Sequence, residues 1–231
     1  MRINKFLSTT GVASRRHSDQ LIADGQVRIN GQRALLGDQV DPDKDKVTIN
    51  GHLVKFQLEM EYFALNKPFA VLSTVTDDRD RQTVSNIVRS NQRLYPVGRL
   101  DYNSTGLLIM TNDGDLALHL THPRYHLSKV YQVEIDKPVH PAHLSQLKLG
   151  ITLDDGPTLP AEITYTDDSK RKFKIILHQG KNRQIRRMFE HFDYRVLRLH
   201  RLSIGPLQLG SLQPGQYRPL TPTEINALKK A

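Results

Sequence analysis

The sequence predicts an α+β protein with two domains, which we place at residues 1–58 and 59–231. The chain has 231 residues, enough for a small domain and a medium one. Its N-terminal part combines two short helical patterns with two Asn-Gly pairs, at residues 30–31 and 50–51. The remainder mixes alternating apolar segments with helical apolar stripes. Mixed charge replaces both patterns at residues 55–61, where we place the linker.

The N-terminal region carries the signals of two helices followed by two hairpins. Apolar residues at helical spacing precede a glycine, and a serine in the N-cap position opens the second helix. Alternating apolar residues then lead into each Asn-Gly pair, which is a strong hairpin signal. These residues are, in order, Ile3, Phe6, Leu7, Gly11, Ser14, Leu21, Ile22, Gly25, Val27, Ile29, Val47 and Ile49. We therefore expect a helix pair packed on short antiparallel strands.

The remaining elements follow from the period of their apolar residues and from the turn residues between them. Alternation or short apolar runs predict strands, and apolar residues three or four positions apart predict helices. We expect strands at 62–65, 107–110, 129–135, 161–165, 173–177 and 197–207, and helices at 84–88, 116–120, 143–148 and 183–192. A terminal helix begins at Thr221, where Thr221 and Glu224 form a capping box around a proline in the first helical position.

Composition limits the classes of function. The chain contains no cysteine, which excludes disulfides, thiolate nucleophiles and cysteine-ligated metal, and which fits a reducing cytosol. No apolar run approaches the roughly 18 residues of a membrane span, and the N-terminus lacks the apolar core of a signal peptide. We therefore expect a soluble, cytoplasmic monomer with no membrane partner.

The charge balance indicates a polyanionic partner. The formal net charge is +9, and clustered cations gain affinity for phosphate by releasing condensed counterions. Between residues 170 and 201, only Glu190 and Asp193 oppose a run of basic residues. That run is Lys170, Arg171, Lys172, Lys174, Lys181, Arg183, Arg186, Arg187, Arg195, Arg198 and Arg201. A solvated charge run is the alternative, but a balance this one-sided favours a nucleic-acid face.

Residues 97–114 place one acid, Asp101, in a polar loop between apolar segments. Turn-forming residues surround it, and the apolar run 107–110 leads away from it as a strand. A loop fixed by a buried strand is a common place for a catalytic side chain. The alternative is an aspartate that only hydrogen-bonds its own turn.

Two further segments carry candidate site residues. Tyr131 lies in the alternating strand 129–135, and from the pattern alone it is equally a core residue and a site residue. Segment 179–192 has one apolar helical stripe and a basic cluster on its other side, and its loop-to-helix junction suits a carboxylate or a phosphate. Histidines 119, 122 and 126 do not have metal-site spacing, because Pro123 interrupts them, so we expect no metal. Neither glycine-rich nucleotide motif occurs, which leaves nucleotide cofactors without support.

Four segments resemble the motifs of one known family. They are Gly98-Arg-Leu-Asp101 with Gly106-Leu-Leu108, Leu65-Asn-Lys-Pro68, Gln184-Ile-Arg186 and the segment 197–207. Together they resemble the pseudouridine synthases, specifically the RsuA-like bacterial ribosomal RNA branch of the RsuA, RluB, RluE and RluF type. The N-terminal pattern with Ser14-Arg-Arg16 resembles the alpha-L RNA-binding fold first seen in a small-subunit ribosomal protein.

The resemblance implies a catalytic domain with a mainly antiparallel central sheet flanked by helices, and it implies roles for individual residues. Asp101 would be the essential carboxylate, Tyr131 would pack against the target base, and Arg186 would pair with Asp101, with Arg187 as the adjacent alternative. Leu199 would line the uracil pocket. We assign substrate contacts to Arg99, Leu199, Arg183 and Arg187, and RNA binding by the N-terminal domain to Arg2, Lys5, Arg15, Arg16 and Arg28.

The expected activity is isomerisation of a specific uridine to pseudouridine in ribosomal RNA, with no cofactor. Residues 37–40 and 184–188 resemble the large-subunit enzymes more closely, so we expect a site in large-subunit ribosomal RNA. The resemblance leaves open whether Asp101 acts as a nucleophile or as a base. The alternative from another class is a non-catalytic RNA-binding or ribosome-assembly protein, which would gain nothing from a carboxylate facing phosphates. A metal-dependent RNA hydrolase would need ligands that the chain does not convincingly supply.

Overall fold

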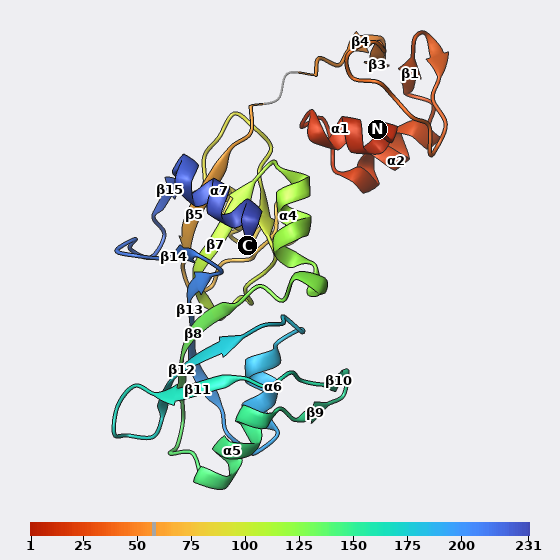
Figure 1. Ribbon diagram of the computed structural model, residues 1–231. Helices are drawn as coiled ribbons and strands as arrows, with labels where there is room; N and C mark the ends of the chain where they lie inside the picture. Colours follow the sequence, from red (N-terminus) through yellow and green to blue (C-terminus); the bar gives the residue numbers. More distant parts are fainter. Residues whose placement is uncertain (57–58) are drawn as a thin grey trace. The chain divides into compact units, whose positions relative to one another are not determined.

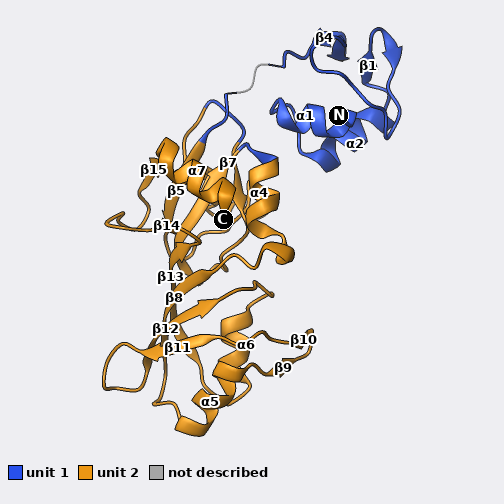
Figure 2. Ribbon diagram, viewed as in Figure 1, with its two compact units in different colours: residues 1–61, 91–93, 112–114 blue, residues 62–90, 94–111, 115–231 orange. Residues whose placement is uncertain are grey.

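The computed structural model describes residues 1–56 and 59–231 and divides the chain into two compact units (Figure 2). The first unit comprises residues 1–61, 91–93 and 112–114, and the second comprises residues 62–90, 94–111 and 115–231. The boundary expected between residues 58 and 59 falls on residues 57–58, which lie outside the described residues.

The first unit consists of two helices and a four-stranded antiparallel sheet in the order β2-β1-β3-β4 (Figure 1). Its elements are α1 (Ile3–Thr9), α2 (Arg15–Ala23), β1 (Val27–Ile29), β2 (Gln32–Arg33), β3 (Val47–Ile49) and β4 (His52–Leu53). Both predicted hairpins are confirmed: Asn30 and Asn50 have φ of 52° and 49°, and the glycine after each also has positive φ, as a two-residue hairpin turn requires. The Ser14 side chain accepts a hydrogen bond from the His17 amide and caps α2.

The second unit is built on a large, mainly antiparallel sheet, as the family resemblance implies. Its strands are β5 (Tyr62–Lys67), β6 (Tyr95–Val97), β7 (Thr105–Thr111), β8 (Lys129–Ile135), β11 (Glu162–Tyr165), β12 (Lys172–Leu177), β13 (Val196–Ile204), β14 (Leu207–Gln208) and β15 (Tyr217–Pro219). The main order is β11-β12-β8-β13-β7-β5-β15, with β14 beside β13 and β6 beside β7. Strands β13 and β7 run parallel, whereas the other pairs of this sheet in the described chain are antiparallel.

Helices and one small hairpin complete the second unit. They are α3 (Val84–Ile87), α4 (Gly114–Thr121), the 3₁₀ helix η1 (Pro123–Tyr125), α5 (Pro141–Leu149), α6 (Gln184–Glu190), α7 (Pro222–Lys230) and the strand pair β9 (Thr152–Leu153) and β10 (Gly156–Pro157). Figure 1 shows α4 beside the part of the sheet that contains β5 and β7, and α6 beside the part that contains β11 and β12. Thr221 and Glu224 form the predicted capping box of α7.

Strand β7 is buried on both faces and joins the two hydrophobic cores of this unit. Leu107 and Ile109 pack in one core with residues of α4 and α7, whereas Leu108 and Met110 pack in the other with residues of β8, β12 and α6. All four side chains are 0 % exposed. The strand that follows the Asp101 loop is therefore fixed from both sides.

The structure differs from the predicted elements at several strands, among them β5, β6 and β15. β6 and β15 were not expected, because each is short and contains a proline, which removes a ladder donor. β5 was expected to end at Leu65, but it continues through Asn66 and Lys67, which pair with Leu107 and Gly106. Pairing with a central strand outweighs the local turn signal of the Asn-Lys-Pro sequence.

No helix within the described ranges is long and apolar enough to cross a membrane.

Candidate active site

The loop that carries Asp101 connects β6 to β7, and its exit is fixed by a close backbone approach at Gly106. Gly106 has φ +104°, and a Cβ atom built there would lie 2.3 Å from the Arg201 carbonyl oxygen on β13. Only glycine tolerates both that conformation and that contact. The glycine of the predicted motif thus permits the parallel pairing of β7 with β13, which sets the end of the Asp101 loop.

Lys67, at the end of β5, holds this loop from the protein interior. Its side chain is 0 % exposed, and Nζ donates hydrogen bonds to the carbonyl oxygens of Pro68 at 3.0 Å and Ser104 at 2.8 Å, with the Tyr102 carbonyl at 3.5 Å. Burial lowers the pKa of Lys67 to about 8; the nearby Asp101 charge opposes this shift and Arg201 adds to it. The loop is therefore held by a buried lysine amine whose pKa is lowered.

Arg186, on α6, holds the same loop from the other side and lies next to Asp101. Its Nη2 donates to the Asn103 carbonyl at 2.9 Å and to Ser104 Oγ at 3.3 Å, and its Nη1 donates to the Val196 carbonyl at 3.0 Å. Its Nε lies 3.7 Å from Asp101 Oδ2, an ion-pair distance. Burial lowers the pKa of the Arg186 guanidinium, and the carboxylate of Asp101 opposes that shift.

Arg187 points away from Asp101 toward the β9–β10 hairpin. Its two terminal nitrogens each lie 2.9 Å from an Asp155 carboxylate oxygen, and its Nε donates to the Asn182 carbonyl. These hydrogen bonds raise the pKa of Arg187 and lower that of Asp155 to about 2. Of the two adjacent arginines, the structure therefore places Arg186 beside the carboxylate and engages Arg187 elsewhere.

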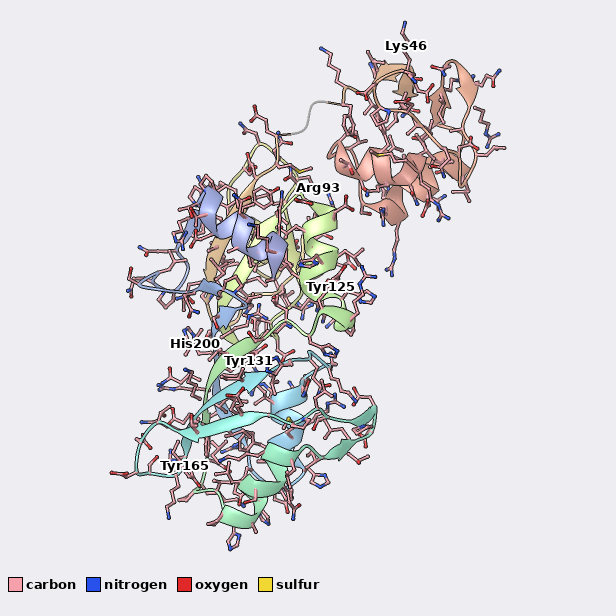
Figure 3. All side chains as sticks on the ribbon, viewed as in Figure 1. Lys46, Arg93, Tyr125, Tyr131, Tyr165 and His200 are labelled. Carbon is pink, nitrogen blue, oxygen red and sulfur yellow. The ribbon has the colours of Figure 1, made fainter. Side chains whose placement is uncertain are left out.

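Asp101 lines a small cleft with a volume of about 70 Å³, and several other candidate residues line the same cleft. Tyr131 on β8 and Leu199 on β13 line it, and they are 9 % and 8 % exposed. Arg99 and Arg183 are exposed residues on its lining. Arg183 occupies the left-handed N-cap position of α6, and its Nη2 lies 3.4 Å from Glu190. Strands β8 and β13, labelled at Tyr131 and His200 in Figure 3, supply the floor of the site.

Two larger clefts adjoin the small one and share residues with it. One, of about 530 Å³, lies between the end of α4 and the loop before α6; the other, of about 490 Å³, lies beside residues 72–77. Arg99 lines all three clefts, and Asp101 also lines the second of the larger ones. An extended ligand therefore has room on both sides of the carboxylate.

The N-terminal candidates are surface residues of the first unit. Arg2, Arg15, Arg16 and Arg28 are exposed, whereas Lys5 is half-buried. Arg28 also donates a hydrogen bond to the Gly31 carbonyl at 3.0 Å.

The basic run at residues 170–201 does not form one face. Arg186 and Arg201 are buried, and several other members of the run are paired with acids. These pairs are Arg171 with Glu134, Lys172 with Asp167, Lys181 and Arg187 with Asp155, Arg183 with Glu190, and Arg198 with Glu134. Alternation along β13 and the rotation between adjacent residues of α6 send neighbouring cations in different directions, which a charge count along the chain does not register.

Three residues of this site were not expected from sequence. Lys67 and Ser104 fix the loop, and Arg201 lies beneath it with only 3 % of its surface exposed. The Asn-Lys-Pro segment did resemble a family motif, but nothing in its pattern indicates that the lysine turns inward. Charged residues are rarely fully buried, so sequence reasoning assigns them to the surface by default.

This fold and this site define a class of protein: an α+β scaffold on which one carboxylate, held on a fixed loop beside an arginine, faces a cleft lined by a tyrosine and a leucine. Within the described ranges, no group of three or more histidine, cysteine or acidic residues is placed to hold a metal ion. Comparison with protein families identifies the class. The RNA pseudouridylate synthase model matches residues 61–191, the S4 domain model matches residues 1–45, and the chain belongs to the RNA pseudouridine synthase family. It is therefore an isomerase with an RNA-binding domain at its N-terminus.

Individual relatives cover the whole chain. An uncharacterized RNA pseudouridine synthase of Aquifex aeolicus is 42 % identical over 100 % of this chain and 94 % of its own length. The ribosomal large subunit pseudouridine synthase B of Bacillus subtilis is 39 % identical over 99 % of this chain and 95 % of its own length. A crystal structure of a pseudouridylate synthase, 31 % identical, covers 99 % of both chains with a TM-score of 0.72. The sequence-based expectation of family and fold is confirmed.

Proposed function

We propose that this protein converts one specific uridine of large-subunit ribosomal RNA into pseudouridine, with Asp101 as the essential catalytic residue. The observation that carries the proposal is the position of Asp101, 3.7 Å from Arg186 on a loop fastened by Lys67, at the opening of a cleft lined by Tyr131 and Leu199. The large-subunit assignment is supported by the name of the Bacillus subtilis relative.

The reaction needs little beyond one well-placed carboxylate. It breaks the bond between N1 of uracil and C1′ of the ribose, turns the freed base, and joins C5 to the same C1′, while the proton on C5 leaves and N1 gains one. Atoms and redox state are conserved. Asp101 serves this chemistry either by attacking the substrate or by removing a ribose proton, and in both cases it acts as an ionised carboxylate. Arg186 places its positive charge 3.7 Å from that carboxylate.

The remaining candidates take supporting roles in the proposal. The target nucleotide leaves its stack at a cost of a few kcal/mol. Its base is received between Tyr131 and Leu199, because these two nearly buried side chains offer an apolar ring and an aliphatic wall. Arg99 and Arg183, exposed at the rim, contact the RNA.

We further propose that residues 1–58 form an RNA anchor and residues 59–231 the catalytic domain. The match of an S4 domain to residues 1–45 supports this division, as do the exposed cations Arg2, Arg15, Arg16 and Arg28, with the half-buried Lys5 at the edge of the set. We propose that the protein acts in the cytoplasm as a monomer, where ribosomal RNA is its partner.

Mapping of pseudouridine at single-nucleotide resolution tests the function. Ribosomal RNA from cells that lack the protein should be missing one modification, which the wild-type gene restores and the Asp101→Asn variant does not. The asparagine preserves the shape of the side chain and removes its charge, so affinity for RNA should stay within about two-fold. Restoration by Asp101→Asn would refute the catalytic role. An unchanged modification map combined with faulty ribosome assembly would instead indicate a non-catalytic assembly protein.

A further inference from the structure

The buried Arg201 and the half-buried Lys129, both close to the site, form no ion pair with an acid among the described residues. Arg201 on β13 is 3 % exposed; its Nε donates to the Leu107 carbonyl at 2.7 Å, and its Nη2 has no hydrogen-bond partner among the described residues. Lys129 on β8 is half-buried, and its Nζ donates to the Leu127 carbonyl at 2.9 Å. Burial, with a smaller effect of the Arg201 charge, lowers the pKa of Lys129 to about 8. Both side chains thus carry positive charge that the free protein does not neutralise locally.

Both cations line the cleft of about 530 Å³ between the end of α4 and the loop before α6. Its lining includes Arg99 and Lys181 as further cations and three histidines, but no aspartate or glutamate within the described chain. This cleft shares Arg99, Tyr131 and residues 179–181 with the cleft at Asp101. Whatever anion it accepts therefore lies directly beside the reacting nucleotide.

The contrast with other cations of the unit indicates a ligand. Arg186 has Asp101 beside it, Arg187 has Asp155, and Lys67 has the carbonyl oxygens of the Asp101 loop. Burying a charge without an opposite charge or a full set of acceptors is costly, so such a site is best explained by an anion that arrives with the substrate. In an RNA-binding enzyme that anion is a phosphate, since each nucleotide carries one.

We propose that this cleft binds a backbone phosphate of the RNA strand next to the target nucleotide, with Lys129 as the contacting cation. Arg201 is too deeply buried to be the main contact. Its charge adds to the positive electrostatic potential that attracts the phosphate. The bound phosphate fixes the strand so that the ribose of the target faces Asp101. This inference rests on the proposed function for the identity of the ligand.

The first experiment measures binding of a large-subunit ribosomal RNA transcript as a function of salt and pH. All variants carry Asp101→Asn, so that turnover does not interfere. Lys129→Met should weaken binding at pH 7 on the order of ten-fold and flatten the salt dependence by about one phosphate contact. The matched control is Lys174→Met, which removes an exposed lysine of β12 and should stay within about two-fold. Equal affinities and equal salt slopes for the two variants would overturn the proposal.

The pH dependence separates a phosphate contact from a structural effect. A phosphate beside Lys129 raises its pKa above about 8, so affinity should fall as pH rises from 7 to 9 in the protein with Lys129. Lys129→Arg should keep the affinity and lose most of this fall, because arginine stays protonated. The charged and titratable groups that line the cleft with Lys129 are Arg99, His122, His126, Tyr131, His178, Lys181 and Arg201. All seven are common to both proteins, so the difference between the two pH curves reports residue 129.

A second experiment locates the phosphate. In an RNA hairpin that carries the modified uridine, single phosphates are replaced by neutral methylphosphonates. Replacing one phosphate adjacent to the target uridine should weaken RNA binding by the protein with Lys129. The same replacement should leave RNA binding by Lys129→Met unchanged. If no replacement weakens binding of the protein with Lys129 more than binding of Lys129→Met, the inference fails even though pseudouridine is formed. If the coupling is present but the wild-type enzyme forms no pseudouridine, the proposed function fails and the phosphate site remains.

Discussion

Replacing Arg186 by methionine should slow the chemical step, whereas the same change at Arg187 should not. Arg186 is 7 % exposed, and its guanidinium joins Asp101 to the carbonyl of Asn103 and the hydroxyl of Ser104. Methionine replaces the aliphatic part of the side chain and removes the charge together with every donor. The variant therefore tests whether the arginine next to the carboxylate supports catalysis or only binds RNA.

The expected magnitude follows from the ion-pair geometry. Two unit charges about 4 Å apart interact by about 4 kcal/mol at the effective dielectric constant of a protein surface. The Asp101 side chain is 30 % exposed, so solvent screens part of this energy and about 2 to 3 kcal/mol remains. If Arg186 stabilises the charge of the transition state by this amount beyond the ground state, its loss lowers the rate on the order of 10²-fold. The loss of two hydrogen bonds to the loop adds to this figure. Arg186→Lys, which retains the charge, should lose less.

Arg187 provides the matched control because it is adjacent in sequence and engaged differently. Its ion pair with Asp155 joins side chains that are 22 % and 44 % exposed. Solvent screens an exposed pair of this kind, so Arg187→Met should change the rate by less than about five-fold. Its effect should appear instead as a looser β9–β10 hairpin, measured by amide hydrogen exchange.

Single-turnover rates at saturating RNA give the chemical step directly, and urea unfolding of both variants shows whether the fold is intact. If Arg186→Met reacts at the wild-type rate while Arg187→Met is slow, the roles of the two arginines are reversed. If both react at the wild-type rate, pairing with the carboxylate is not part of catalysis.

Three further perturbations test other parts of the structure. Gly106→Ala should lower the free energy of unfolding by about 3 kcal/mol or more in urea, because its Cβ would lie 2.3 Å from the Arg201 carbonyl at positive φ; wild-type stability would refute that contact. The pKa of a lysine in the unfolded chain is near 10.4, whereas burial lowers the pKa of Lys67 to about 8. Between these pH values the unfolded chain binds more protons, so the free energy of unfolding should rise with pH. The free energy of unfolding of Lys67→Met should rise less over that pH range. Identical stability curves for the variant and the wild type would contradict the lowered pKa of Lys67. Deleting residues 1–58 should flatten the salt dependence of ribosomal RNA binding, and an unchanged slope would exclude these residues as an anchor.

The sequence alone determined the features that depend on local chemistry. Asn30-Gly31 specifies its hairpin because both residues must adopt positive φ, and Thr221 with Glu224 specifies the start of the last helix because their side chains cap each other's amides. The motif around Asp101 identified the family because its residue types and spacing recur together. These signals need no knowledge of what packs against them.

Only the tertiary structure decided which way the charged residues point. Arg186 and Arg187 are neighbours with the same chemistry, but the rotation of about 100° between adjacent residues of α6 sends the first to Asp101 and the second to Asp155. Lys67 and Arg201 look like surface cations in the sequence, yet both are buried beneath the Asp101 loop. Burial, and the pairing of β7 with β13 that creates it, depends on segments nearly a hundred residues apart, and no local pattern records that contact.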